Sequence, residues 1–441
     1  MNRKTLKTFA ALGLTLAFAA GALAHDYVPG KTQNEPALLK GGDLYTVSDG
    51  VKPATDLIFE KGRITQIGKN LTAPEGARVI DVSGKRVYPG VIAPYTSIGL
   101  IEVGSVRATN DLDEVGSVNP EVSAHIAYNP DSEIIPTVRA NGITTVVVAP
   151  RGGLIRGRSS LINLDGWTKE DASEVVDLGL HISWPGVAIS TGWWVTQSPD
   201  EQREQQAKSR KLITDAFDEA KAYYEAKKAN GGLAKHDLRW EAMIPVFEKT
   251  MPVFIEADDY RQIDQALAFA DKYDINIIIV DGFESWKMAD ELSRRGVPVI
   301  LRSTQSNPQR QDYDYDLPFR IPRLLHDAGV KFCFSKGGSS TSSWDARNLP
   351  FQAGQAVAFG LDPAAALRGL TLSTAEILGV DADLGSLTVG KKATIVVSDG
   401  DIMDQLTNRV VYEFIEGRAV DLNNKHKELF EKYRKKSLSQ R

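Results

Sequence analysis

The stretch "MPVFIEADDYRQIDQALAFADKYDINIIIVDG", residues 251–282, decides the fold class. It begins with a near-continuous apolar run, 251–257, and ends with another, 275–282. Runs of Val, Ile and Phe without polar alternation are typical of strands buried on both faces of a parallel sheet. Between the two runs, apolar residues recur at helical spacing. The stretch therefore predicts a strand, a helix and a second strand in one sheet.

The same alternation extends along most of the chain. Further apolar runs occupy 142–150, 297–303 and 330–336, and helical patterns occupy 285–296 and 319–329. A regular strand and helix repeat predicts a parallel α/β sheet. Such a sheet is either closed as a (β/α)8 TIM-like barrel or open and doubly wound.

The two ends of the chain differ from this central part. Short β-like runs separated by Gly and Asp turns fill residues 37–88 and return near the C-terminus. The simplest arrangement is one small composite β-domain, built from 25–88 and 381–425, beside a barrel over 89–380. The last residues, 426–441, read as a charged helix or tail.

Residues 1–24 carry the pattern of a secretory signal peptide. Basic residues precede an apolar stretch, and the A-x-A signature ends at Ala24. We expect cleavage after Ala24, a periplasmic or secreted protein, and no membrane span in the mature chain. Cys333 is the only cysteine, so an intrachain disulfide is excluded, and its apolar strand predicts a packed thiol. A net charge of −5 argues against a nucleic-acid partner.

Residues 200–230 form a long, highly charged helical pattern, preceded by Trp193 and Trp194. A solvated helix and a lid or partner surface both fit this pattern. Together with Trp344, the two tryptophans also leave open a carbohydrate-binding or solute-binding module. No duplication into two similar lobes is visible, however.

Three motifs carry a resemblance to a known family. They are "VYPGVIAP" at 87–94, "NLPFQAGQAVAFGLDPAAALRGLTLSTAEILGV" at 348–380, and "LGSLTVGKKATIVVSDGD" followed by "FIEGRAV". In this order they resemble the amidohydrolase superfamily, in particular its imidazolonepropionase-like branch. The resemblance implies a (β/α)8 barrel with a composite β-domain. It also implies hydrolysis of amide-like or cyclic C–N bonds with one or two zinc-like ions.

The resemblance also locates the metal ligands, and this chain departs from them. The His-x-His of the first barrel strand falls on Tyr95 and Ser97. The histidines of the fifth and sixth strands fall on Glu256 and Asp281, and the aspartate of the eighth falls on Lys336. We therefore expect no zinc or other cofactor. In place of the metal we expect Lys336 to form a salt-bridged cluster with the two carboxylates.

Two functions follow from this altered site. In the first, the protein hydrolyses C–N bonds without metal, with Glu256 or Asp281 as general base and Lys336 or Tyr95 as electrostatic stabiliser. In the second, it is a non-catalytic pseudo-enzyme, a ligand-binding or assembly subunit. Its partners are then a small molecule and, in a homo- or hetero-oligomer, an active paralogue.

Further candidate residues lie outside these positions. The Gly-rich loop after the 142–150 strand offers Arg151, Arg156 and Arg158 for capture of an anion or carboxylate, and Ser97 is a further candidate ligand contact. The loop lacks the Lys-Ser/Thr ending of a phosphate loop. His181, on an apolar strand, is expected to be a hydrogen-bonded core residue.

Overall fold

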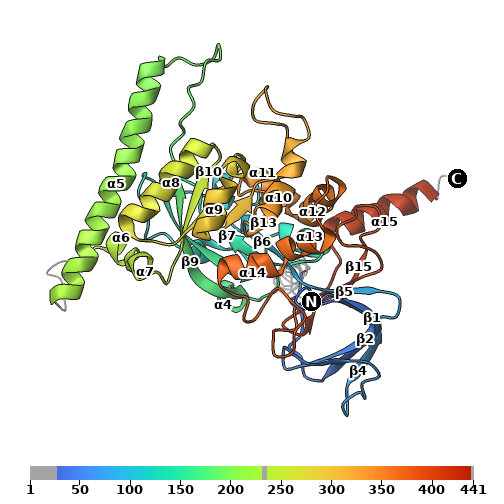
Figure 1. Cartoon of the computed structure of the whole chain (residues 1–441). Coiled ribbons are helices and arrows are strands. Elements are labelled where there is room, and N and C mark those ends of the chain that lie inside the picture. The colour runs from blue at the N-terminus through green and yellow to red at the C-terminus, as the bar shows by residue number, and fades with distance from the viewer. Residues whose placement is uncertain (1–26, 231–235, 439–441) are drawn as a thin grey trace, which may run out of the picture.

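The computed structural model describes residues 27–230 and 236–438 and consists of two sheets with helices around one of them (Figure 1). The expected signal peptide lies outside the described residues. None of the described helices has the length and apolar character that crossing a membrane requires.

Eight strands form a nearly closed barrel, as the alternation of strands and helices predicts. Their order around the barrel follows the chain. The strands are β6 (Val91–Thr96), β7 (Ile143–Val148), β8 (Ile155–Asn163), β9 (Ser173–Ser183), β10 (Val253–Ala257), β11 (Ile277–Asp281), β12 (Val299–Leu301) and β13 (Phe332–Phe334). The first and last strands lie side by side, where the Ser335 hydroxyl donates to the carbonyl oxygen of Tyr95 at 3.5 Å.

One strand breaks the regular repeat. β8 pairs antiparallel with both of its neighbours, whereas all other barrel pairs are parallel. The reason is the short connection 149–154, because a parallel crossover needs a dozen residues or more. Much of the sequence that we expected to be a Gly-rich loop is therefore the hairpin into β8 and the strand itself.

Helices cover the outside of the barrel, and the interior is apolar. The longer helices are α5 (Pro199–Asn230), α8 (Tyr260–Tyr273), α9 (Ala289–Arg295), α10 (Leu317–Asp327), α12 (Leu349–Ala358), α13 (Pro363–Leu370) and α14 (Leu372–Leu378). Shorter helical segments are η1 (Arg107–Thr109), α2 (Ala124–Ala127), α3 (Ile134–Arg139), α4 (Lys169–Ala172), α6 (Leu238–Glu241), α7 (Ile244–Phe247), η2 (Ser285–Met288), α11 (Ser340–Asp345) and η3 (Ala346–Asn348). Inside the barrel, Phe254, Ile278, Val280 and Cys333 pack in one cluster. Strand alternation explains this, since Ile277 and Ile279 pack outward in the larger core.

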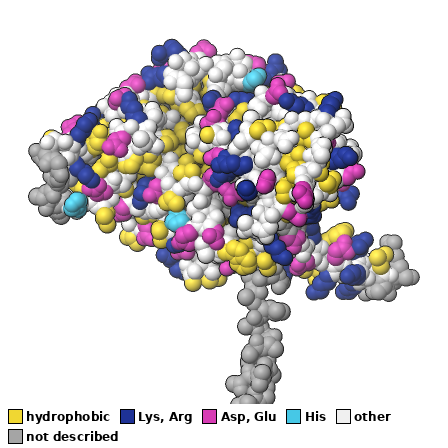
Figure 2. Space-filling model, turned by 90° about the horizontal axis from the view of Figure 1, so that it is seen from below, with side chains coloured by type: hydrophobic (Ala, Val, Ile, Leu, Met, Phe, Trp, Pro, Cys, Tyr) yellow, Lys and Arg dark blue, Asp and Glu magenta, His cyan; other side chains and the backbone are white. Residues whose placement is uncertain are grey.

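The second sheet joins both ends of the chain, as predicted. It contains β1 (Ala37–Tyr45), β2 (Val51–Glu60), β3 (Arg63–Gly68), β4 (Arg78–Asp81), β5 (Arg86–Pro89), β14 (Ile395–Ser398), β15 (Val410–Ile415) and β16 (Arg418–Ala419). The junction between the two parts is the antiparallel pair of β5 and β14. The C-terminal helix α15 (Lys425–Leu438) buries none of its residues and stands out from the body of the molecule (Figure 2).

A buried ion-pair cluster connects the barrel to this β-domain. Arg139 lies 3.3 Å from Asp165, and the same carboxylate lies 3.3 Å from Arg418 of β16. The Arg139 guanidinium also donates to the Tyr27 hydroxyl at 2.6 Å. We call Tyr27, Arg139, Asp165 and Arg418 the interdomain cluster.

Candidate functional site

The C-terminal ends of the barrel strands meet at one end of the barrel, the mouth. The loops that follow β9 and β12 rise on this side (Figure 1). Trp193 and Trp194 are exposed in the loop before α5. Since barrel active sites form at this end, the mouth is the place to look for one.

Glu256 is the centre of the polar contacts at the mouth. One of its carboxylate oxygens lies 2.9 Å from the Arg151 guanidinium and 2.6 Å from that of Arg156, and it accepts a short hydrogen bond from the Tyr95 hydroxyl. We call Tyr95, Arg151, Arg156 and Glu256 the mouth cluster. Burial alone raises the pKa of Glu256, but the positive charges of Arg156 and Arg151 outweigh it and hold this pKa below its usual range.

Tyr95 is a buried, neutral member of this cluster. Its hydroxyl accepts hydrogen bonds from Arg151 at 2.7 Å and from Arg156 at 3.1 Å. Burial and the negative charge of Glu256 raise the pKa of this hydroxyl far above its usual value. Tyr95 therefore holds its proton at all ordinary pH values and orients the Glu256 carboxylate.

The register of β8 decides which arginine enters the mouth. Ile155 faces Ile182 of β9 and Gly157 faces His181, so Arg156 is an extra residue in a β-bulge. Gly157 has a φ of 115°, a conformation that favours glycine. The bulge shifts the alternation of the strand, and Arg156 therefore points inward.

Arg158 does not join Arg156 at the mouth. Arg158 lies beyond the bulge, on the opposite face of β8, where its guanidinium pairs with Asp177 and donates to the carbonyl oxygen of Glu121 at 2.8 Å. Simple strand alternation places residues two apart on one face, so the sequence alone predicted Arg156 and Arg158 on the same face.

Lys336 is also placed differently from the prediction. Its ammonium lies 3.5 Å from the Ser303 hydroxyl and 3.9 Å from Asp345, and the described residues show no ion pair between it and Glu256 or Asp281. The prediction of a Lys336 cluster with these carboxylates is therefore wrong. Arg151 and Arg156 neutralise Glu256 because they reach it from β8 and the hairpin before it.

Ser97 does not line the mouth. Its buried hydroxyl lies 2.6 Å from that of Ser343 and 3.2 Å from the carbonyl oxygen of Ser339. It therefore joins the end of β6 to the segment after β13, and in this structure it is closed to a ligand.

Asp281 lies at the end of β11 in an unusual backbone conformation. Its φ is 72°, in the left-handed region that Asp tolerates better than most residues. In the described part of the chain its carboxyl group makes no hydrogen bond and no ion pair. Burial and the negative charges of Asp258 and Glu256 raise its pKa to about 7, against the attraction of Arg302. Asp281 is thus a carboxyl group that changes charge near neutral pH.

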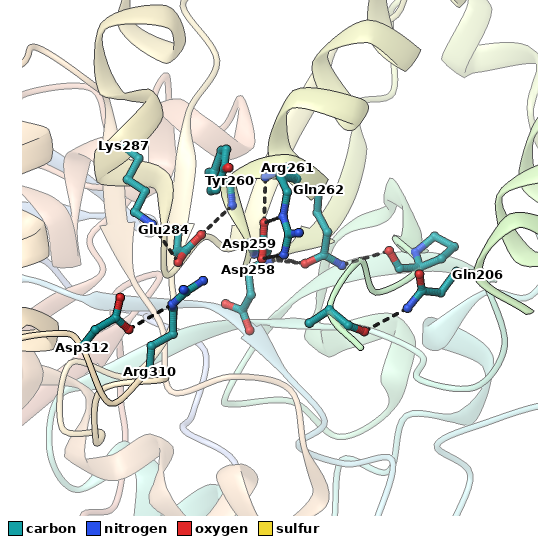
Figure 3. A network of polar contacts seen from close by, with 12 residues as sticks. Gln206, Asp258, Asp259, Tyr260, Arg261, Gln262, Glu284, Lys287, Arg310 and Asp312 are labelled. Carbon is teal, nitrogen blue, oxygen red and sulfur yellow. Dashed lines mark hydrogen bonds and ion pairs between the residues drawn. The ribbon is translucent and has the colours of Figure 1, made fainter. Parts of the chain in front are cut away.

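Further polar residues at the mouth were not foreseen. Asp258 follows Glu256 by two residues and pairs with Arg302, which follows β12, at 2.6 Å. Figure 3 shows Asp258 in the polar loops after β10 and β11, near Glu284. Glu284 is buried and paired with Lys287 at 3.0 Å. A polar residue just past the end of an apolar strand is the signal that identifies Asp258 and Arg302.

His181 lies one layer deeper in the barrel than the mouth cluster. Its ring stacks between Tyr95 and Phe254, with ring centroids 5.5 Å and 4.6 Å apart. Burial and the charge of Arg156 lower its pKa to about 3. It is a core residue as expected, but in the described residues its Nε2 has no hydrogen-bond partner.

The fold can be compared with known structures once this geometry is described. An amidohydrolase from Thermotoga maritima superimposes with a TM-score of 0.77 over 87% of this chain and 99% of its own, at 24% identity. The fold is that of an amidohydrolase. Residues 319–423 match the amidohydrolase family. Molinate hydrolase has the same fold at a TM-score of 0.54, over 90% of this chain and 96% of its own, at 16% identity.

Two sequence relatives each match part of this chain. The amidohydrolase tasK of Hapsidospora irregularis is 20% identical over 380 residues, which are 78% of this chain and 38% of that protein. A dihydroorotase of Geobacter sulfurreducens is 44% identical over 55 residues, 12% of this chain and 13% of its own length. The chain thus spans much less than two thirds of either relative.

The residues at the mouth do not fit the zinc that an amidohydrolase fold implies. The Glu256 oxygen that faces the cluster already accepts a hydrogen bond from Tyr95 and pairs with two guanidinium groups. The positive charge of these groups repels a divalent cation. The Ser97 hydroxyl is engaged elsewhere and Lys336 is itself a cation. In residues 27–230 and 236–438, no three His, Cys, Asp or Glu side chains gather in a group that could hold a metal.

A wide cavity of about 1030 Å³ lies at the opposite end of the barrel. It is lined by the beginnings of β10 and β11 and by the end of α14, and Figure 2 looks onto this side of the molecule. The charged residues at this cavity, among them Arg158 and Arg295, are paired with neighbouring carboxylates. Asp281, by contrast, lies at the mouth, away from this cavity.

Proposed function

We propose that this protein hydrolyses amide-like C–N bonds without a metal, with Asp281 as the group that accepts and returns the proton. The observation that carries the proposal is the Asp281 carboxyl group, which lacks a hydrogen-bond partner in the described residues and has a pKa of about 7. A general base with a pKa near the working pH combines the right charge state with sufficient basicity. Its place at the mouth of an amidohydrolase fold supports the assignment.

The reaction follows from these groups. The Asp281 carboxylate takes a proton from water as the water oxygen forms a bond to the carbonyl carbon. Within the mouth cluster, Arg151 donates through Nη1 to Tyr95 and Glu256. We assign to its guanidinium the stabilisation of the negative charge that develops on the carbonyl oxygen. The C–N bond then breaks, and the proton on Asp281 moves to the leaving nitrogen.

The experiment compares turnover of a panel of amides and lactams by wild type, D281N and D290N, all treated with a chelator. Asp290 is an exposed residue of α9 and serves as the matched control. We expect D281N to lower kcat by about 100-fold or more and D290N to leave it unchanged. For wild type, kcat/KM should rise with pH through about 7, because the base must be deprotonated. Loss of wild-type turnover on chelation would disprove the metal-free reaction.

A second function is supported by the mouth cluster itself. Tyr95, both arginines and Glu256 contact one another, as in a structural ion-pair network. A non-catalytic subunit that binds a small molecule, or assembles with an active paralogue, would keep such a network. In that case the panel shows no turnover, while a panel compound still raises the melting temperature of the wild type.

We also propose that the protein is exported. Cleavage after Ala24 would leave Tyr27 close to the new N-terminus. The Tyr27 hydroxyl donates to Asp165 at 2.8 Å, so the mature chain would be held to the barrel from its first few residues. N-terminal sequencing of the protein from a periplasmic extract tests the cleavage site. A first residue other than His25 contradicts it.

A further inference from the structure

Lys336 is a largely buried cation without a close counter-charge. Its side chain is 15% exposed, and its nearest carboxylate, Asp345, is 3.9 Å away and 55% exposed. The Ser303 hydroxyl, at 3.5 Å, is its other contact. Burying a charge is costly unless it is paired, so this arrangement favours an anion that the chain itself does not supply.

The other cations at the mouth differ from Lys336. Arg151 and Arg156 are within 2.9 Å of Glu256, and Arg302 is 2.6 Å from Asp258. Their charges are therefore met by carboxylates of the chain itself. Of these four cations, Lys336 is the one without a carboxylate of the described residues within 3 Å.

The fold brings Lys336 close to the proposed reactive group. Ser303, its hydroxyl neighbour, lies two residues beyond Leu301, which is the register partner of Asp281. Lys336 and Asp281 thus follow the two strands that flank β12, so about two strand spacings of about 4.8 Å separate their backbones. The backbone after Lys336 also packs on the mouth cluster, since a Cβ on Gly338 would lie 2.9 Å from both Tyr95 and Arg151.

We propose that Lys336 binds a carboxylate group of the ligand and so selects small molecules that carry a carboxylate a few bonds from an amide-like C–N bond. N-acyl amino acids and carboxylated cyclic amides have this arrangement. The choice of an amide rests on the proposed function, whereas the carboxylate is inferred from Lys336 alone.

The experiment uses two probes of nearly equal size, N-acetylglycine and the uncharged N-acetylglycinamide. Their affinities are measured by titration calorimetry with wild type, K336Q, K336R and K331Q. Lys331 lies just before β13, half-exposed and paired with Glu376 at 2.9 Å, and is the matched control at the other end of the strand.

We expect wild type and K331Q to bind N-acetylglycine about 10- to 100-fold more tightly than N-acetylglycinamide, the range of a charge-assisted hydrogen bond. K336Q should lose this preference, and K336R should keep part of it. Equal affinity of wild type for the two probes, binding of neither, or an unchanged preference in K336Q would each overturn the proposal. If K336Q does not fold, K336R carries the test, and a preference equal to that of wild type would overturn the proposal.

The same experiment separates this inference from the proposed function. Carboxylate preference without turnover on the panel supports Lys336 as a binding residue and contradicts the hydrolase. Turnover that depends on Asp281 but shows no carboxylate preference supports the hydrolase and contradicts the role of Lys336.

Discussion

The interdomain cluster and the mouth cluster are built from the same groups, and their central carboxylates, Asp165 and Glu256, differ in their access to water. Each combines a tyrosine hydroxyl, two arginines and one carboxylate. In the first, the Arg139 and Asp165 side chains are 1% and 0% exposed. In the second, Arg151 and Glu256 are 29% and 14% exposed. A sealed ion pair holds two parts of the chain together, whereas a cluster at the mouth can also act on a ligand.

Their acidic neighbours differ in the same way. Glu413 of β15, near the interdomain cluster, is fully buried, and its pKa is raised well above the usual value because burial outweighs the attraction of Arg139. Burial therefore favours its protonated form. Asp281, beside the mouth cluster, has a pKa of about 7 and can exchange a proton with solvent. Only the second neighbour is suited to acid–base chemistry.

The largest effect is expected from R139M in the interdomain cluster. Removing the guanidinium leaves the buried Asp165 with a weaker set of partners, and breaking a buried pair in this way costs about 3–5 kcal/mol. Urea denaturation measures the loss. Turnover or ligand affinity per folded molecule should not change. A loss below about 1 kcal/mol would show that the cluster does not hold the two parts of the chain together.

E256Q in the mouth cluster should be less destabilising, by about 1–3 kcal/mol, because its arginines remain partly hydrated. It removes a negative charge close to Asp281 and leaves two guanidinium groups unpaired. Both changes favour the Asp281 carboxylate, so the Asp281 pKa should fall below 7. The carboxyl carbon shift in a 13C NMR titration reports this pKa. An unchanged titration would separate Asp281 from the mouth cluster.

D281N tests the charge state of Asp281 through stability. The folded-state pKa, about 7, lies above the ordinary value of 3.8, so between these pH values the folded state binds more protons than the unfolded state. The free energy of unfolding of wild type should therefore fall as the pH rises from 4 toward 8. D281N should lack this component, worth about 1–2 kcal/mol after allowance for partial hydration. Parallel slopes for the two proteins would contradict the raised pKa.

The smallest effect is expected for R158A. Its pair with Asp177 is partly exposed and worth about 0–1 kcal/mol. R156A, two residues away, should lower the stability more and should raise the Asp281 pKa by removing a positive charge from the mouth. The same measurements of denaturation and titration apply. Equal effects of the two variants would contradict the assignment of opposite faces to Arg156 and Arg158.

Much of the fold could be predicted because burial leaves a pattern along the chain. The apolar runs at β10, β11, β12 and β13 are strands, and the β-rich ends do form one sheet. Tyr95, Glu256 and Asp281 also lie at the mouth, since each is the last or next-to-last residue of a barrel strand. The end of a strand can be located in the sequence because the apolar run stops there.

Side-chain partners were less predictable, because they depend on local backbone geometry. The left-handed conformation of Asp281 departs from strand alternation, by which it would share the outer face with Ile277 and Ile279. The extra residue in β8 selects Arg156 and turns Arg158 away. The family resemblance and the charges predicted that Lys336 pairs with Glu256 and Asp281. The actual partners of Glu256 come from the antiparallel hairpin, which the regular repeat did not suggest.

The bulge in β8 also affects how relatives of this protein are aligned. One inserted residue reverses the inward and outward alternation of the residues that follow it. The same sequence without the insertion would bring a different side chain into the barrel. A relative that conserves Arg156 by sequence position but lacks Gly157 could place its guanidinium among the outer helices. The phase of β8, as well as sequence position, therefore decides which arginine faces the mouth.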